Sequence, residues 1–358
     1  MNKLICEEIF QRFHAWWKHE ETERPMMRII ARKKEPIGSL ENLSYFNDPQ
    51  ALHVNPEYRV GLVRNQLKTH TFYAEAFPYV NLNMGAGSMA VYLGCNPVFS
   101  NHTIWIEPLK VETFSHFDSL KYDGNNYWWK LHQEALQKAV ELADDEFYIA
   151  IPDIIEGLDI LSSLRGANNL CFDIMDEPDA VKRRLDEINQ LYYKYYDRVY
   201  DIVKKADGSA CYTAFSILAQ GRVAKIQCDF SAMISPVQFR DFALTHLKEQ
   251  CKNLDYTVYH LDGTDAICHL DAILEMEQLN ALQWTPGAGK EDGGNEMWYP
   301  IYDKTVAAGK GLWISLSGSS DVMFEKAKRL IRRYGAKWLY LVFEPTDEDG
   351  AKKLLKLN

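Results

Sequence analysis

The sequence predicts a (β/α)8 barrel preceded by an N-terminal segment of helices. Eight short runs of apolar and β-branched residues recur from residue 80 onward, and amphipathic stretches separate them. Strict alternation of strand and helix is typical of a parallel sheet, and eight repeats favour closure into a barrel. We therefore expect residues 1–75 to form a helical extension packed on the barrel, and residues 76–358 to form the catalytic barrel.

Each predicted element follows from its periodicity and its flanking residues. The eight predicted strands are Val80–Met84, Phe147–Ile151, Ala210–Phe215, Ala224–Cys228, Thr257–His260, Ala281–Trp284, Leu312–Leu316 and Leu339–Phe343. The clearest predicted helices are Ala180–Lys204, Pro236–Lys252, Ala266–Glu275, Tyr299–Ala308 and Val322–Tyr334. Ser235 before Pro236 provides a helix cap followed by a first-turn proline.

A doubly wound open sheet is the rival fold, and it predicts a glycine-rich turn after the first strand. The stretch Met84–Ser88 is the only candidate, and it lacks the third glycine of the dinucleotide-binding fingerprint. The sequence therefore favours the barrel. The long polar and aromatic stretch Gly94–Asn126 lies between the first two predicted strands, where an insertion would form a lid or a pocket wall.

The composition excludes several classes of function. The 358 residues carry a net charge of −10, whereas binding of nucleic-acid phosphates requires clustered lysine and arginine. No apolar run approaches the roughly 20 residues that a membrane span needs. The seven cysteines show no paired spacing, so we expect reduced thiols. Together these features predict a cytoplasmic protein that acts on a small molecule.

The strongest candidate site is His260-Leu261-Asp262-Gly263 at the end of a predicted strand. Residues two apart on a strand point to the same face, so His260 and Asp262 are both expected to face the barrel axis. They could bind a divalent metal such as zinc, or they could form an acid–base pair. Alternatively, Asp262 caps the helix near Asp265 and His260 is a hydrogen-bonded barrel residue.

Other strand ends supply further candidates. Glu344 ends the last strand and is the best third metal ligand, unless it caps the next segment. Asp229 follows the fourth strand and is a candidate catalytic carboxylate. Cys228 could be a soft ligand, although a buried cysteine is more often an apolar filler. The candidate substrate-binding residues are Trp284, Asn83, Asp153 and Phe215.

At these residues the chain resembles the uroporphyrinogen decarboxylase superfamily, from about Pro78 onward and in the same order. The matching pieces are Met84–Gly94 before Cys95-Asn96-Pro97, Asp229 followed by Ile234-Ser235-Pro236-x-x-Phe239, His260-x-Asp262-Gly263, and Ser315–Gly318. The resemblance implies a (β/α)8 barrel with its site at the mouth. The superfamily includes porphyrinogen decarboxylases and zinc-dependent methyltransferases that serve corrinoid proteins.

Departures from the family pattern select between these two activities. The sequence shows no Arg-Gln-Ala-Gly-Arg-type stretch near its start, and Asn81-Leu82-Asn83 stands where a decarboxylase has its acidic residue. The methyltransferases place zinc on His-x-Cys and a distant cysteine, whereas this chain has His260-x-Asp262 and Glu344. Carboxylates in place of thiolates favour an oxygen-bearing substrate or a metal other than thiolate-bound zinc.

The resemblance implies a metal-assisted methyltransferase that acts with a separate corrinoid protein, and it implies a homodimer. The chain has no Asp-x-His-x-x-Gly signature, so the corrinoid would come on the partner protein. One alternative is a decarboxylase or lyase of a small organic acid, with His260 and Asp229 transferring protons. Another is a non-catalytic barrel that binds a small molecule. A glycosidase is disfavoured because no carboxylate pair can be placed at the required separation.

Overall fold

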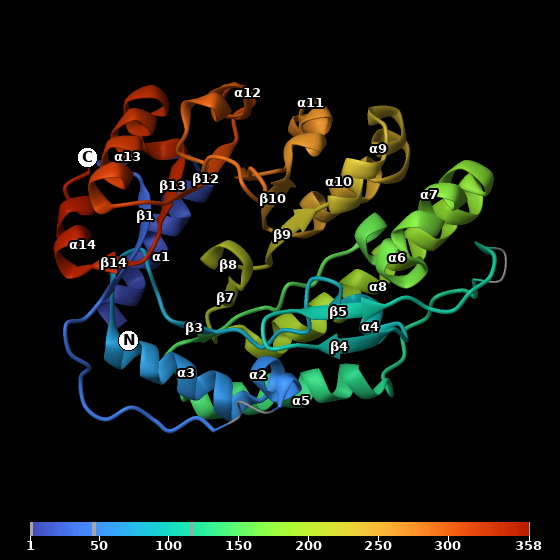
Figure 1. The fold of residues 1–358 in the computed structure, drawn as a ribbon, viewed down its shortest axis with the longest axis horizontal. Coiled ribbons are helices and arrows are strands. Elements are labelled where there is room, and N and C mark those ends of the chain that lie inside the picture. The colour runs from blue at the N-terminus through green and yellow to red at the C-terminus, as the bar shows by residue number, and fades with distance from the viewer. Residues whose placement is uncertain (1–2, 45–47, 115–116, 358) are drawn as a thin grey trace.

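The computed structural model describes residues 3–44, 48–114 and 117–357, and it shows a mixed α/β fold around a mostly parallel sheet (Figure 1). The main sheet has eight strands. Their order is β14 (Thr346–Asp347), β1 (Met26–Arg32), β13 (Leu339–Phe343), β12 (Gly311–Leu316), β11 (Ala281–Thr285), β10 (Tyr256–Asp262) and β9 (Val223–Gln227), with β2 (His70–Ala74) antiparallel to β1. The other pairs in this sheet are parallel, as the alternation of strand and helix predicts.

The remaining strands form small pairs beside the main sheet. β3 (Tyr79–Val80) pairs in parallel with β6 (Tyr148–Ile149), and β7 (Ser209–Tyr212) forms a hairpin with β8 (Ile217–Gln220). A single parallel bridge from Ile151 to Tyr212 joins the end of β6 to β7. Between the described strands the hydrogen-bonded ladder does not run through a complete ring, so closure of the barrel stays a prediction.

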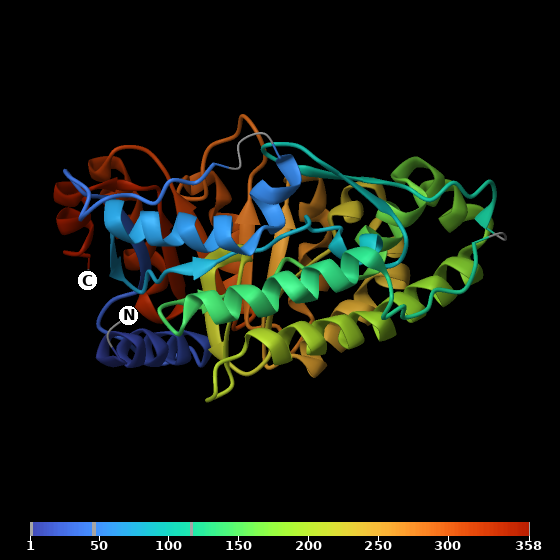
Figure 2. The ribbon, with the colours of Figure 1, turned by 90° about the horizontal axis from the view of Figure 1, so that it is seen from below.

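Helices cover the outside of these strands. Figure 2 shows α3 (Pro56–Thr69), α5 (Tyr127–Ala143) and α8 (Pro178–Val203) side by side on the face that is turned to the viewer. The helices are α1 (Lys3–Trp17), α2 (Pro49–Val54), α3 (Pro56–Thr69), α4 (Ser88–Tyr92), α5 (Tyr127–Ala143), α6 (Gly157–Arg165), α7 (Ala167–Asp176), α8 (Pro178–Val203), α9 (Pro236–Phe242), α10 (Leu244–Asn253), α11 (Leu270–Leu274), α12 (Tyr299–Ala307), α13 (Ser320–Tyr334) and α14 (Glu348–Leu354). None of the described helices is both long and apolar enough to cross a membrane.

The N-terminal segment departs from the expectation of helices alone. It contains α1 to α3, but it also contains β1 and β2, and β1 lies between β13 and β14 in the main sheet. The apolar run around Met26-Met27 is buried on both faces, so it shows no alternation that would distinguish a strand from a helix. Residues 1–75 therefore contribute directly to the sheet.

Two other elements differ from their predicted form. The predicted strand Ala210–Phe215 stops at Tyr212, because Phe215 and Ser216 take positive φ values of 66° and 51° and turn the chain into β8. The predicted helix Pro236–Lys252 is broken into α9 and α10 at Ala243. The Gly94–Asn126 insertion contains a hairpin of β4 (Asn96–Phe99) and β5 (Ile104–Glu107), and its residues 115 and 116 lie outside the described residues.

A buried carboxylate anchors the start of β1. Glu75 is 1% exposed and accepts hydrogen bonds from the Arg24 guanidinium at 2.7 and 2.9 Å and from the Met27 N–H at 2.8 Å. Arg12 of α1 adds an ion pair, with its Nε 3.3 Å from Oε1 of Glu75. Glu75 therefore ties α1, β1 and the end of β2 together.

Replacing this anchor is expected to cost much more stability than replacing an exposed acid. Glu75→Ala leaves two arginines without their partner and should lower the free energy of unfolding by about 3 kcal/mol. The exposed pair of Lys138 and Glu141 provides the control, and Glu141→Ala should change stability by less than about 0.5 kcal/mol. Urea denaturation measures both variants, and equal losses would contradict the role of Glu75.

Candidate metal centre

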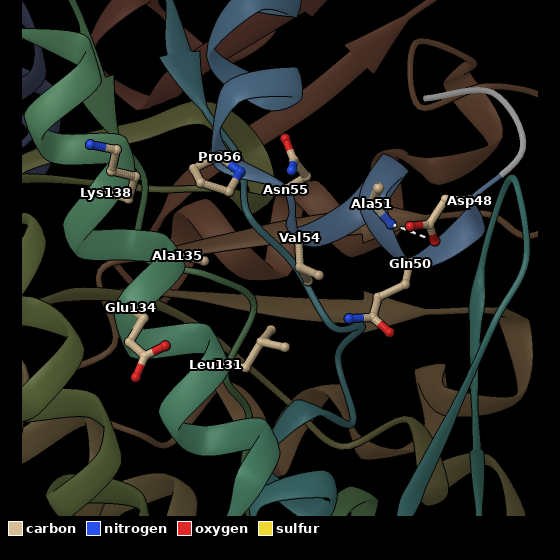
Figure 3. Close-up of a pocket in the computed structure, with 10 residues that line it drawn as sticks. All are labelled: Asp48, Gln50, Ala51, Val54, Asn55, Pro56, Leu131, Glu134, Ala135 and Lys138. Atoms are coloured by element: carbon tan, nitrogen blue, oxygen red, sulfur yellow. Dashed lines mark hydrogen bonds between the residues drawn. The ribbon is translucent and has the colours of Figure 1, made fainter. Parts of the chain in front are cut away.

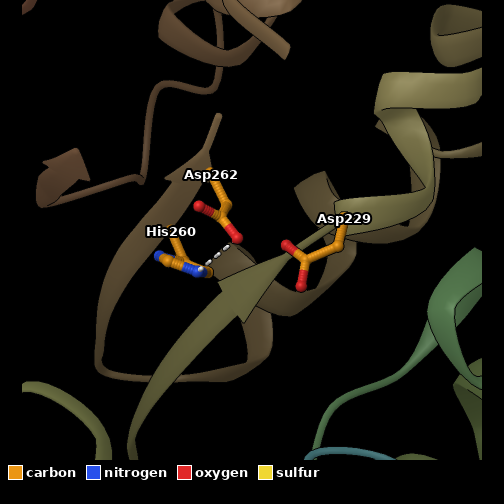
Figure 4. A group of neighbouring side chains, drawn as sticks. All are labelled: Asp229, His260 and Asp262. Atoms are coloured by element: carbon orange, nitrogen blue, oxygen red, sulfur yellow. Dashed lines mark ion pairs between the residues drawn. The ribbon is translucent and has the colours of Figure 1, made fainter. Parts of the chain in front are cut away.

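Three side chains predicted from the sequence come together at the ends of two neighbouring strands (Figure 4). Asp229, His260 and Asp262 each offer a potential ligand atom, and these atoms all lie within 4.8 Å of one another. His260 Nε2 is 3.9 Å from Asp262 Oδ2. Among the described residues, no other group of three histidine, cysteine or acidic side chains converges in this way.

Strand pairing produces this convergence. β10 ends with His260 and Asp262 on one face, and β9 runs beside it with Gln227 paired to His260. Asp229 follows two residues later, where the chain leaves β9 for a turn of 3-10 helix at Asp229–Met233. The carboxyl ends of parallel strands meet at one edge, and this edge is where sites form in α/β proteins.

The His260 ring is fixed by a neighbour on β11. Its Nδ1 hydrogen-bonds to Oε1 of Gln283, and the Gln283 amide in turn donates to the Thr285 hydroxyl at 2.8 Å. An amide oxygen accepts, so Nδ1 carries the proton and Nε2 keeps its lone pair toward Asp262. Metal-binding histidines in proteins are oriented in this way by a partner on the other ring nitrogen.

Asp229 is held by a second, buried carboxylate. Asp159 of α6 accepts hydrogen bonds from the backbone N–H groups of Asp229 at 2.9 Å and of Phe230 at 2.8 Å. The Gln227 amide nitrogen lies 2.7 Å from Asp159 and 2.8 Å from Asp229, so it bridges the two carboxylates. These bonds fix the direction in which the Asp229 carboxylate leaves the chain.

The electrostatics of the centre favour a neutral histidine and a proton-holding carboxyl. Burial and the charge of Lys225 lower the pKa of His260, while Gln283 and Asp262 act in the opposite direction. Burial and the neighbouring Asp159 carboxylate raise the pKa of Asp229 to about 7. Lys225 is itself buried and pairs with Asp153 at 2.7 Å. A divalent cation would relieve the repulsion among the carboxylates at this edge.

Two of the predicted substrate-binding residues lie beside this centre. The Phe215 ring centroid is 5.5 Å from that of His260 and 5.1 Å from that of Trp313. Asp153 contacts Lys225 and accepts from the Tyr212 hydroxyl at 3.2 Å. Both therefore contribute to the surroundings of His260.

Trp284 does not line the site, contrary to the prediction. It pairs with Leu261 in the register of β10 and β11, so it shares the face of Leu261 and points away from His260. Trp284 is 2% exposed, and the centroid of its ring lies 5.1 Å from that of Trp298. Gln283, one residue earlier on β11, is the residue that contacts the His260 ring.

The structure does not bring Glu344 or Cys228 into the group of potential ligands, and the predicted substrate-binding residue Asn83 serves a local turn. The Glu344 carboxylate accepts from the Gly318 N–H at 3.0 Å and so bonds to the loop after β12, not to the next segment that it was alternatively expected to cap. Asn83 accepts from the Gly85 N–H at 2.9 Å and shapes a turn after β3. Cys228 is buried, and this burial raises the pKa of its thiol well above the usual range. Asp229 takes the third position that Glu344 was expected to fill.

The supporting residues Gln227, Gln283, Thr285, Lys225 and Asp159 were missed by sequence reasoning. Gln227 lies two residues before Asp229, so alternation along the strand identifies it. Gln283 and Thr285 lie directly beside the two candidate ligands of β10 in the strand register. Asp159 lies on α6, 70 residues before Asp229. No local pattern in the sequence connects the two.

A separate hollow of about 340 Å³ lies between α2, the start of α3 and α5 (Figure 3). Its lining residues, including Asp48, Val54 and Glu134, belong to helices and their caps rather than to strand ends. The Asp48 carboxylate accepts from the Ala51 N–H at 3.2 Å and caps α2. This hollow offers no cluster of ligating groups and is not the centre described above.

Comparison with known proteins finds a likeness in structure. No family model and no curated protein matches the sequence. A solved structure of a methyltransferase from Methanosarcina mazei matches with a TM-score of 0.63, covering 97% of this chain and 97% of that one. The two sequences are 14% identical, so the likeness shows that the two proteins share a fold over nearly their whole length.

Two substitutions should move the pKa of His260 in opposite directions. Lys225→Gln removes a nearby positive charge and should raise the pKa of the imidazole, whereas Asp262→Asn removes a negative charge and should lower it. Titration of the His260 ring signals by NMR in metal-free protein measures both shifts. Lys326→Gln, which removes a lysine paired with Asp292, is the control and should leave that pKa unchanged. Shifts of the same sign in both variants would contradict this description.

Proposed function

We propose that this protein is a metal-assisted methyltransferase that exchanges a methyl group between a small oxygen-bearing substrate and the cobalt of a corrinoid on a separate protein. The observation that carries the proposal is the convergence of Asp229, His260 and Asp262 within 4.8 Å. The likeness in fold to a methyltransferase over 97% of the chain supports the same class of reaction.

The donor set fits a divalent cation such as zinc. Two carboxylates and one imidazole form a harder ligand set than thiolates, and the imidazole is already oriented by Gln283. A metal bound there would act as a Lewis acid that stabilises negative charge on the substrate oxygen. Metal uptake would displace the proton that Asp229 holds below about pH 7, so affinity should rise with pH up to that value.

The chain's own residues prepare the reacting oxygen. Gln283 holds His260 in one orientation, and Phe215 packs against its ring. In the demethylation direction, a cob(I)alamin on the partner protein would accept the methyl group with its own electron pair, and the substrate oxygen would keep the electron pair of the broken methyl–oxygen bond. Bulk water would return a proton to that oxygen, because Asp229 as a metal ligand has already lost its proton.

A second candidate is a decarboxylase or lyase of a small organic acid. The observation that favours it is the pairing of a carboxyl whose pKa is about 7 with a neutral imidazole, which suits proton transfer near neutral pH. This activity would persist in metal-free protein, whereas the proposed methyl transfer would not.

The test of the proposal is the formation of methylcobalamin from cob(I)alamin and a panel of methyl ethers of small phenols and alcohols, under anaerobic conditions with added zinc. We expect product with the wild-type protein, and a rate lower by roughly 100-fold or more in His260→Ala and Asp262→Ala. Glu344→Ala should keep the wild-type rate, because its carboxylate caps Gly318. Wild-type rates in a folded His260→Ala variant, or no product with any ether, would contradict the proposal.

A further inference from the structure

A second cavity contains two arginines that have no carboxylate partner. It measures about 440 Å³ and lies between β1, α3 and the ends of β3 and β7. Arg28 of β1 and Arg59 of α3 both line it. Among the described residues, neither arginine forms an ion pair with an acidic side chain.

The two guanidinium groups differ in how they are held. Arg59 donates to the carbonyl oxygens of Asn81 at 2.6 Å and of Leu52 at 3.3 Å, which fixes its position but leaves its charge uncompensated. Burial lowers the pKa of Arg59, as expected for a cation removed from water. Arg28 Nε is buried and has no hydrogen-bond partner. Both side chains are half-buried, and cations partly removed from water without an ion partner are costly, so this arrangement suits a bound anion.

The other residues that line the cavity indicate the kind of molecule to which the anionic group belongs. Leu62, Phe72 and Phe77 form an apolar part of the lining beside its polar side chains, and they suit a ligand with an apolar body better than a bare inorganic anion. Asn81 Oδ1 is a buried acceptor that lacks a donor. The chemistry therefore calls for a carboxylate on an apolar body that also bears a hydroxyl or amino group.

The register of the main sheet relates this cavity to the candidate metal centre. Arg28 pairs with Val342, and Val342 pairs with Ser315, two residues beyond Trp313. Trp313 pairs with Gln283, which pairs with His260. Neighbouring residues in paired strands share a face, and so do residues two apart, so Arg28 lies on the same face as His260 and level with Asp262.

The segment from Thr213 to Phe215 contributes both to the arginine cavity and to the surroundings of His260. Thr213 lines the arginine cavity, and Phe215, two residues later, packs on the His260 ring. The Tyr79 hydroxyl, which also lines the cavity, bonds to the Thr213 carbonyl at 3.1 Å and to the Ser216 hydroxyl at 3.0 Å. A molecule bound to the arginines therefore lies against the segment that supports His260.

We propose that Arg28 and Arg59 bind the carboxylate of a small organic acid with an apolar body and a hydroxyl or amino group. As an assignment of substrate class, this inference rests on the proposed function, because the same molecule would present its oxygen to the centre at His260. The guanidinium pair would select acids over neutral analogues, since charge-assisted hydrogen bonds require the anion.

The test uses 4-hydroxyphenylacetate, its neutral analogue 4-hydroxyphenylacetamide and inorganic phosphate as probes in isothermal titration calorimetry. The protein is treated with EDTA, so that binding at the arginines is measured without any metal. We expect the acid to bind about ten-fold or more tightly than the amide and than phosphate. Arg28→Gln should weaken binding of the acid about ten-fold or more, and it should fold normally because it removes no hydrogen bond of Arg28 Nε.

Arg64→Gln is the control variant. Arg64 lies on α3, the helix that carries Arg59, but it pairs with Glu146 outside the cavity. It should bind the acid like the wild type. Failure of the acid to bind, equal binding of acid and amide, equal binding of phosphate, or wild-type affinity in Arg28→Gln would overturn the inference. Each of these results would leave metal binding at His260 untouched, and loss of metal binding alone would leave the arginine site standing.

Discussion

The candidate centre depends on the parallel register of β9, β10 and β11. This register sets Gln227, His260 and Gln283 in one row, with an amide side chain on each side of the imidazole. One amide orients the ring, and the other bridges the Asp159 and Asp229 carboxylates. A shift of one residue in either pairing would turn these side chains to the opposite face and would disperse the centre.

A strained turn packs beside this row, and hydrogen bonds from two neighbouring strands hold the turn in place. Phe215 and Ser216 adopt left-handed backbone conformations, which cost of order 1–3 kcal/mol each for residues other than glycine. Trp313 donates to the Phe215 carbonyl at 2.9 Å, and Tyr340 donates to the Ser216 carbonyl at 3.1 Å. These bonds offset the strain and keep Phe215 against His260.

Sequence reasoning anticipated the parts of the structure that local pattern controls. The alternation of strand and helix indicated a parallel sheet, and the spacing of His260 and Asp262 placed both on one face. It failed where distant contacts decide the outcome. β1 is buried on both faces and shows no alternation, Trp284 packs away from the site that it was predicted to line, and Asp159 reaches Asp229 from a helix 70 residues earlier.

The central claim is that Asp229, His260 and Asp262 hold a divalent cation without help from a thiolate. X-ray absorption at the zinc edge of the reconstituted protein tests this claim most directly. We expect one zinc per chain with a shell of nitrogen and oxygen only, at about 2.0–2.2 Å, and loss of the imidazole signal in His260→Ala. A sulfur ligand at about 2.3 Å, or an unchanged spectrum in that variant, would contradict the account.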